Sequence, residues 1–325
     1  MTKPHLILGI GELLWDVLPE NAAHRGVPLA GFTATGLLGG APANFAVMAG
    51  RLGNHAVILS RIGRDDLGRL AIDQLDPLPV DTSSLQVDPA HETGRVTVNL
   101  MSGEPSYTIH QPAAWDFLVL TDEWVKLAER ADAICFGSLA QRSVESRKTI
   151  QTLAANAPTQ CIRVFDVNLR APFYSSEVIQ ESLELATVLK MNEQETPTIV
   201  DLLGLSISGE PAAATYLRCS AERLMQEFPT LELVAITRGS NGSLLVNRDQ
   251  WHDHPGSPVK VADPVGAGDA FTAAITHYML RGTDLATLNA AGNRWGGWVA
   301  SQPGAMPPLP DSVRDTISAA IEAEP

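Results

Sequence analysis

The stretch DPVGAGDAF, residues 263–271, places two glycines between two aspartates and runs directly into an apolar helical pattern. Gly266 and Gly268 let the backbone turn so that successive N–H groups point the same way, and the helix that follows adds the positive end of its dipole. These features predict an anion site, for which phosphate is the obvious ligand. An alternative is that Asp269 only caps the helix and that the glycines only form a turn.

The position of Asp269 predicts a weak base, because the field at a helix start lowers the pKa of a carboxyl group. A weak base suits phosphoryl transfer, since the transition state is often loose and the attacking hydroxyl loses its proton late. The N–H groups of the same turn would stabilise charge on the transferred phosphoryl. No Gly-Lys-Ser/Thr follows the glycines, which excludes a Walker A loop, and the set of protein-kinase motifs is missing.

Away from this stretch, short apolar runs rich in Val and Ile alternate with helical patterns. The runs lie at residues 6–10, 56–63, 133–138, 161–167, 187–192 and 233–237. Strands that alternate with helices predict a doubly wound α/β fold, with a mainly parallel sheet covered by helices on both faces. Apolar residues at helical spacing predict helices over 45–52, after residue 269, and over 311–323.

Two segments, about 13–36 and 91–112, break this alternation. Within the second, residues 95–110 read as two strands around an SGEP turn. We expect both segments to form a small β-sheet that stands off the main body, as an insertion in a single domain over 1–325. An exposed face on that sheet predicts a homodimer formed through it.

The composition favours a small-molecule partner. Hydrophobic residues make up 45% and charged residues 18% of the 325 residues, as in globular proteins, and the formal net charge is −14 without a Lys/Arg cluster. This charge argues against binding to nucleic acid or to an anionic membrane surface. The three cysteines have no metal-type spacing and predict a reducing cytoplasm. No apolar run approaches the roughly 20 residues that span a bilayer.

A second glycine stretch, LLGGAPANFAVMAGRLG, covers residues 37–53. Gly39 and Gly40 allow a ligand to approach the backbone, and Asn44 in the first helical turn offers donors and an acceptor to hydroxyls. Asp16, after the first strand, has acceptors suited to vicinal sugar hydroxyls. The alternatives are that the glycines form only a turn into a helix and that Asp16 is only solvated.

Polar residues and glycines also follow three of the predicted strands, where open parallel sheets place ligand groups. They are Asn168, Arg170, Asn192, Glu195, Thr237, Gly239 and Gly242. Asn192 and Glu195, three residues apart, could jointly hold a hydrated magnesium ion, although the start of a surface helix explains them equally well. The segment with Thr237 is either a turn between strands or a nucleotide contact.

These motifs, in this order, resemble the ribokinase-like (PfkB) carbohydrate kinases over nearly the whole chain. The resemblance rests on GGAPANFAVMAGRLG followed by IGRDDLGR, and on DPVGAGDAFTAAI, the most specific of the three. The stretches GELLWDVLP, DVNLR and MNEQE look like the fructokinase and 2-keto-3-deoxysugar kinase branches.

The resemblance implies ATP-dependent transfer to a primary hydroxyl of a sugar, with Asp269 matching the catalytic base. The anion hole would be Gly266, Ala267 and Gly268. The sugar-binding residues would be Asp16, Gly39, Gly40, Asn44 and Arg170. The nucleotide-binding residues would be Asn192, Thr237, Gly239, Gly242 and Asn293.

The resemblance also implies two metal ions. Glu195 matches the residue associated with Mg²⁺. The positions matching a K⁺ site are Asp263, Val265, Val299, Gln302 and Gly304. Pro308 departs from the pattern, since it falls where some members supply a hydroxyl.

Fructose is the sugar that these branch-specific stretches favour. A 2-keto-3-deoxygluconate kinase is the first alternative, which additional basic residues facing a sugar carboxylate would favour, and a nucleoside kinase is the second. A catalytically silent sugar-binding regulator is the non-enzyme alternative, and the intact Asp269 with both glycines argues against it.

Overall fold

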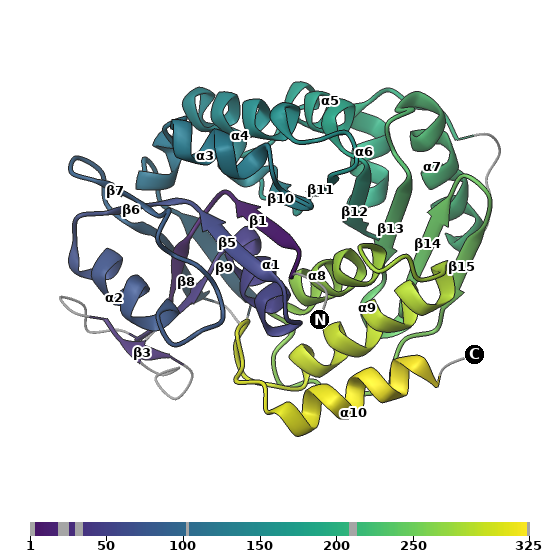
Figure 1. Cartoon of the computed structure of the whole chain (residues 1–325). Helices are drawn as coiled ribbons and strands as arrows, with labels where there is room; N and C mark the ends of the chain where they lie inside the picture. The colour runs from purple at the N-terminus through teal and green to yellow at the C-terminus, as the bar shows by residue number, and fades with distance from the viewer. Residues whose placement is uncertain (1–3, 19–25, 30–34, 102–103, 208–212, 324–325) are drawn as a thin grey trace.

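The computed structural model (Figure 1) describes residues 4–18, 26–29, 35–101, 104–207 and 213–323. Its centre is an eight-stranded sheet in the order β15-β14-β13-β12-β11-β10-β1-β5. The strands are β1 (Leu6–Ile10), β5 (His55–Leu59), β10 (Ala133–Gly137), β11 (Ile162–Asp166), β12 (Val188–Asn192), β13 (Leu233–Thr237), β14 (Ser243–Asn247) and β15 (Trp251–His254). From β5 to β13 neighbouring strands are parallel, and the last two are antiparallel.

The predicted strands are therefore all present in one sheet. The run over 56–63 is divided, because β5 ends at Leu59 and Arg61–Gly63 forms a separate strand, β6. β6 pairs with β7 (Gln86–Asp88) in a two-stranded sheet. The segment after Thr237 is the turn between strands that the sequence left open, since it joins β13 to the antiparallel β14.

Helices cover both faces of the large sheet, as the alternation predicts (Figure 1). They are α1 (Ala41–Arg51), α2 (Asp66–Leu75), α3 (Asp122–Ala128), α4 (Val144–Asn156), α5 (Ser176–Leu185), α6 (Glu195–Leu202), α7 (Ala213–Glu227), α8 (Ala267–Met279), α9 (Leu285–Ala300) and α10 (Asp311–Glu322). One core contains Trp124 and Ile150 from the α3–α7 side. The other contains Phe45, Phe271 and Trp295, from α1, α8 and α9. Their side chains remove the two faces of the sheet from water.

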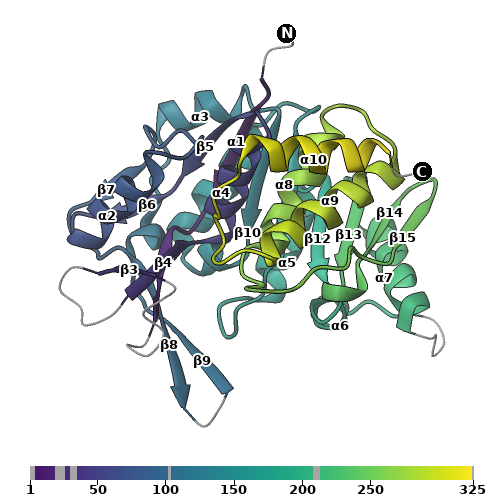
Figure 2. The same ribbon diagram turned by 90° about the horizontal axis from the view of Figure 1, so that it is seen from below.

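A separate five-stranded sheet has the order β3-β4-β2-β8-β9. Its strands are β2 (Leu14–Leu18), β3 (Val27–Pro28), β4 (Thr35–Gly39), β8 (Gly94–Met101) and β9 (Glu104–Ile109). β8 and β9 pair as an antiparallel hairpin, as expected for residues 95–110. Figure 2 shows this hairpin extending away from the main body. Residues 19–25 and 30–34 of the first segment lie outside the described residues.

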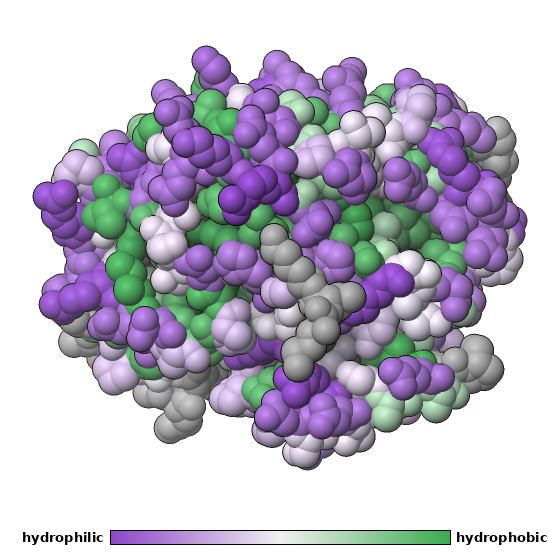
Figure 3. Space-filling model, viewed as in Figure 1, coloured by the Kyte–Doolittle hydropathy of each residue, from purple (hydrophilic) through white to green (hydrophobic). Residues whose placement is uncertain are grey.

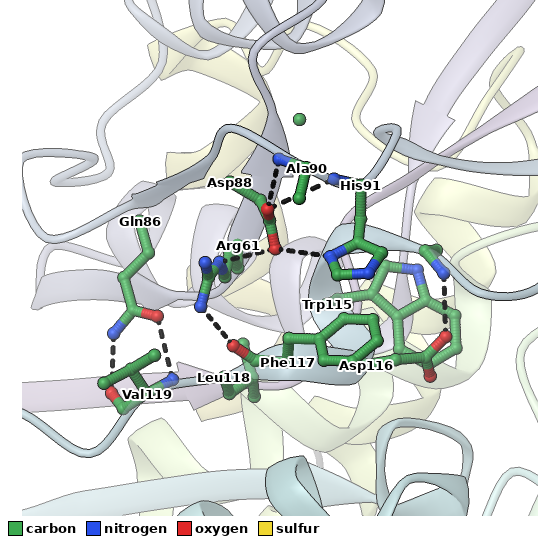
Figure 4. A network of polar contacts seen from close by, with 12 residues as sticks. Arg61, Gln86, Asp88, Ala90, His91, Trp115, Asp116, Phe117, Leu118 and Val119 are labelled. Carbon is green, nitrogen blue, oxygen red and sulfur yellow. Dashed lines mark hydrogen bonds and ion pairs between the residues drawn. The ribbon is translucent and has the colours of Figure 1, made fainter.

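A polar network fixes the root of this hairpin to the body (Figure 4). Asp88, at the end of β7, forms an ion pair with Arg61 at 3.1 Å and a hydrogen bond with the His91 ring at 3.0 Å. The His91 ring stacks on Phe117, which lies in the short helix η2 (Ala114–Phe117), with the ring centroids 3.7 Å apart. The chain that leads into β8 is thereby held on two sides.

Candidate active site

The first turn of α8 forms the floor of the candidate site. Gly266 precedes the helix with a φ of 80°, and a Cβ there would lie 2.6 Å from the Cα of Ala305. Only glycine fits both the left-handed backbone and this close approach. The next N–H groups lie in the first helical turn, where the helix itself offers them no acceptor. The Ala267 N–H donates to the Pro264 carbonyl at 3.3 Å, and an anion hole formed by Gly266, Ala267 and Gly268 stays a prediction.

Asp269 lies in this turn and is held from a distant part of the chain. The Asn44 side chain donates a hydrogen bond of 2.7 Å from Nδ2 to Asp269 Oδ2. Loss of hydrating water and the neighbouring Asp166 raise the pKa of Asp269 to about 6, against the opposing effects of Lys190 and Asn44. The sequence-based expectation of a lowered pKa is therefore wrong, because desolvation outweighs the field of the helix start.

A buried ion pair lies directly beneath the first turn of α8. Lys190 Nζ is 3.0 Å from Asp166 Oδ1, and a Cβ on Gly268 would lie 2.9 Å from the same Nζ. Burial lowers the pKa of Lys190, but Asp166, Glu195 and Asp269 outweigh it, so the pKa is raised and the ammonium stays charged. Thr272 of α8 completes the cluster by donating to Asp166 Oδ2 at 3.0 Å.

Sequence analysis missed this cluster. Its signal is a charged residue inside each of two apolar strands, Asp166 at the end of β11 and Lys190 in β12. The two positions are paired in the parallel register. A charge in a buried strand needs a partner, so each residue predicts the other once the strand order is known.

The residues expected to bind the sugar come together beside Asp269. A Cβ on Gly39 would lie 3.7 Å from Asp16 Oδ2 and 3.9 Å from Asn44 Oδ1, so these two acceptors face the same backbone. Asp16 belongs to β2 of the small sheet and is partly buried. Desolvation raises its pKa to about 6, while Arg170 acts in the opposite direction. Arg170 is exposed beyond β11, and its charge reaches Asp16 and Asp269 alike.

Asn192 and Glu195 form a compact turn between β12 and α6. Asn192 Oδ1 accepts a hydrogen bond from the Glu195 backbone N–H at 2.8 Å, and Glu195 Oε2 accepts one from the Asn192 backbone N–H at 2.9 Å. The other Glu195 oxygen accepts from Leu169 N–H at 2.8 Å. Carboxylate and amide oxygens are ligands that suit Mg²⁺. Because both Glu195 oxygens already accept backbone hydrogen bonds, the pair fits a hydrated Mg²⁺ ion that is held mainly by other ligands.

The expected nucleotide residues lie around the junction of β13 and β14. Thr237 is paired with Asn192 across β12 and β13, and its carbonyl accepts from the Glu193 N–H at 2.9 Å. Gly239 and Gly242 both have positive φ, 57° and 79°, in the turn that follows. Asn293 of α9 donates to Ser243 Oγ at 2.7 Å, which joins α9 to the start of β14.

Among the residues that match a K⁺ site, the buried Asp263 has a structural role that does not involve a cation. Asp263 accepts from the N–H groups of Val265 at 3.1 Å and Gly304 at 3.2 Å, and so ties two loops together. The Gln302 N–H donates to the Val299 carbonyl at 2.9 Å. These groups have hydrogen-bond partners within the protein, and their hydrogen bonds connect the two loops without a cation. The K⁺ site stays a prediction.

The described residues contain neither a membrane-spanning helix nor a cluster of acidic, histidine or cysteine side chains placed to hold a metal. None of the described helices is both long and apolar enough to cross a membrane. Within the same residues, no group of three or more His, Cys, Asp or Glu side chains is arranged to hold a metal ion.

Known proteins are similar to this chain in sequence and in fold. A family model described as pfkB family carbohydrate kinase matches residues 5–312. A protein of Pyrococcus horikoshii named "Putative sugar kinase PH1459" is 30% identical over 297 residues, covering 89% of this chain and 87% of that protein. The fructokinase of Escherichia coli is 30% identical over 322 residues, covering 93% and 95%.

Solved structures agree with this assignment. PH1459 in complex with ATP, titled an uncharacterized sugar kinase, superposes with a TM-score of 0.78 at 29% identity, covering 97% of this chain and 99% of that one. A fructokinase from Vibrio cholerae O395 with fructose, ADP and calcium ion bound gives a TM-score of 0.75 at 26% identity, with 98% of each chain covered. The predicted family and the predicted fold are both confirmed.

Proposed function

The chain belongs to the pfkB family of carbohydrate kinases, and from this premise we propose that it transfers the γ-phosphoryl group of ATP to a primary hydroxyl of fructose. The observation that carries the proposal is the 2.7 Å hydrogen bond from Asn44 to Asp269. This bond joins the glycine loop expected to hold the sugar to the carboxylate expected to accept its proton. A sugar seated over Gly39 would then meet both groups.

In this proposal Asp269 orients the attacking hydroxyl and accepts its proton late. A pKa of about 6 leaves most Asp269 side chains ionised at neutral pH and more basic than an ordinary aspartate. The N–H groups at the start of α8 face the transferred phosphoryl, with the charged Lys190 beneath them, and oppose the charge that develops there. Mg²⁺ bound to the nucleotide near the Asn192–Glu195 turn would add further positive charge.

Fructose is supported by relatives named fructokinase and by the fructose-bound structure at 26% identity. A second candidate is 2-keto-3-deoxygluconate, whose carboxylate could meet a cation in the site. Arg170 is the cation whose charge acts on Asp16, Glu12 and Asp269, but Arg170 alone does not decide between the two sugars. A nucleoside substrate is supported only by the fold, through an aminoimidazole riboside kinase structure at 23% identity.

The test is ADP release with a panel of sugars, run with and without potassium. The panel contains fructose, 2-keto-3-deoxygluconate, ribose and a nucleoside. We expect the highest kcat/KM with fructose, and a loss of about 10²–10⁴-fold in Asp269→Asn. Asp284→Asn is the matched control, because Asp284 also lies at a helix start but caps α9.

Two outcomes would contradict the proposed chemistry, and a third would contradict only the choice of fructose. Asp269→Asn with the parent's rate on every accepted sugar would remove Asp269 from the chemistry. Tight binding of a sugar by the parent protein, measured by calorimetry, with no ADP release would favour the silent sugar-binding regulator. A preference for 2-keto-3-deoxygluconate would keep the kinase and change only its substrate.

A further inference from the structure

Glu12 is a buried carboxylate that the proposed reaction does not use. It lies where the chain leaves β1 of the large sheet for β2 of the small one, and its side chain is only 3% exposed. Its Oε1 accepts a hydrogen bond of 3.3 Å from the backbone N–H of Ala41, the first residue of α1. Ala41 directly follows the passage from β4 back to the body, so Glu12 connects two crossings between the sheets.

The start of α1 has no cap of its own. Gly40 occupies the N-cap position without a side chain, and the first turn contains no acidic residue. Helix starts are normally stabilised by a side-chain acceptor and by negative charge. Glu12 supplies the acceptor from 29 positions away, and negative charge when it is ionised. The backbones of Gly40 and Glu12 also approach each other closely. A Cβ on Gly40, whose φ is 115°, would lie 2.3 Å from the Glu12 carbonyl oxygen.

The first turn of α1 leads from Glu12 to the reacting groups. Gly40 O accepts from the Asn44 N–H at 2.9 Å, so this turn fixes the Asn44 backbone. The Asn44 side chain in turn holds Asp269 at 2.7 Å. The path from Glu12 to the proposed base therefore consists of one helical turn and two side-chain hydrogen bonds.

Glu12 is costly to keep in this place. Its Oε2 is buried and has no hydrogen-bond partner among the described residues, and the same is true of Asn44 Oδ1. Burial, with a smaller contribution from the charge of Asp269, raises the pKa of Glu12, while hydrogen bonds from the backbone and the charge of Arg170 lower it, and the net pKa is about 7. An unsatisfied buried carboxyl group destabilises a fold, and such groups concentrate at functional sites.

We propose that Glu12 is a positioning residue of the kinase site, which clamps the first turn of α1 and so holds Asn44 against Asp269. This inference rests on the proposed role of Asp269. Glu12 lies apart in the chain from the expected nucleotide residues, which belong to β12, β13, the turn after β13 and α9. Loss of the clamp should therefore affect the sugar and the rate, and should leave the binding of ATP intact.

The experiment compares Glu12→Ala with Glu12→Gln, which keeps an acceptor oxygen of the same reach. For Glu12→Ala we expect a fall in kcat/KM for the sugar of about 10–100-fold, since small displacements of reacting groups cost up to about 10²-fold, with the KM for ATP unchanged. Glu12→Gln should recover most of that loss. Combining Glu12→Ala with Asn44→Ala should lower activity no further than the worse single variant, because both act through one unit.

Amide hydrogen exchange gives a readout that does not depend on the chemistry. Exchange at residues 41–44 should rise in Glu12→Ala and stay near the parent's rate in Glu12→Gln. Thr121→Ala is the matched control, since it removes the cap of α3, a 3.2 Å bond to the Trp124 N–H, elsewhere in the fold. It should lower stability and leave the sugar kinetics unchanged.

The proposal is overturned if folded Glu12→Ala keeps the parent's kcat and sugar KM, if the losses of the two single variants multiply in the double variant, or if the KM for ATP rises as much as that for the sugar. These outcomes differ from failure of the proposed base. If Asp269→Asn stays active while residues 41–44 still loosen in Glu12→Ala, the role of Asp269 fails and the clamp on α1 remains.

Discussion

Two opposing effects meet at Asp269, and their balance decides how it acts. The start of α8 favours the carboxylate, while loss of water and the nearby Asp166 favour the protonated form, and the net result is a raised pKa of about 6. A base at the start of a helix therefore need not be a weak one, because enclosure by the protein restores its basicity. The charged Lys190 beneath it keeps the shift moderate.

Removing the positive charge of Lys190 should make Asp269 harder to ionise. For Lys190→Met we expect the acid limb of the pH profile of kcat/KM to move to higher pH, since only ionised Asp269 can accept the proton. We also expect kcat to fall by about 10²-fold, as for the loss of a charge-stabilising donor. Steady-state kinetics between pH 5 and 9 measure both effects.

The control for Lys190→Met is the double variant Lys190→Met/Asp166→Asn. A buried Asp166 without its partner destabilises the protein, and the double variant removes this effect. Asp166 also raises the pKa of Asp269, so the acid limb of the double variant should lie below that of Lys190→Met. Identical acid limbs in the parent and Lys190→Met would contradict the prediction.

Asp269→Asn should stabilise the protein while it removes activity. A carboxyl group whose pKa is higher in the folded state costs stability as the pH rises from its unfolded value, near 4, through its folded value, here about 6. The gain in Asp269→Asn should therefore be close to zero at pH 4, grow up to pH 6, and stay constant above pH 7. We expect up to about 2 kcal/mol, discounted because part of the side chain meets solvent. Urea unfolding across this range measures it, and a gain that is largest at pH 4 would contradict it.

At the level of helices and strands, apolar periodicity predicted the sheet and the helices α1, α8 and α10. It succeeded because burial on one or both faces leaves a regular signal along the chain. It could not pair Asp166 with Lys190 or Glu12 with Ala41. These contacts depend on which strands are neighbours and on how two crossings pack, and neither property has a local pattern. The predicted direction of the Asp269 pKa shift was wrong for the same reason, since the segments that bury Asp269 are distant in the sequence.

The helix α2 shows how one side chain can fix both a helix and the root of the small sheet. Asp65 Oδ1 accepts from the Gly68 N–H at 2.7 Å, which caps the start of α2. The same carboxyl group accepts from the Thr93 N–H at 2.7 Å and from the Thr93 hydroxyl at 2.6 Å. Thr93 immediately precedes β8.

Asp65→Ala should therefore cost more than the loss of an ordinary helix cap. We expect a loss of about 2–4 kcal/mol, from one cap and two further hydrogen bonds. The neighbouring Asp66→Ala is the control, because Asp66 is exposed and its ion pair with Arg69 lies at the surface, which predicts a change below about 1 kcal/mol. Equal midpoints of urea unfolding for the two variants would show that the Asp65 contacts do not stabilise the fold.

At the scale of the whole molecule, the candidate site lies between two sheets. Asp16 belongs to the small sheet, while Asn44 and Asp269 belong to helices of the main body. The face drawn in Figure 3 is largely hydrophilic, with hydrophobic residues in recesses between the polar ones. Dimerisation through the small sheet stays a prediction, and Tyr107 of β9, 64% exposed, is a residue that it would cover.

A ligand that binds to both sheets should draw them together. We expect fructose with a non-hydrolysable ATP analogue to lower the radius of gyration measured by small-angle X-ray scattering, because the small sheet would close as a lid and exclude water that competes for the phosphoryl group. Asp16→Asn should show less compaction at the same sugar concentration, since the amide offers a sugar's vicinal hydroxyls one acceptor oxygen in place of two. Asp65→Ala should weaken the root of the β8–β9 hairpin and broaden the distance distribution of the free protein. If calorimetry shows that the parent binds the sugar and its radius of gyration does not change, the small sheet is a fixed wall of the site and not a lid.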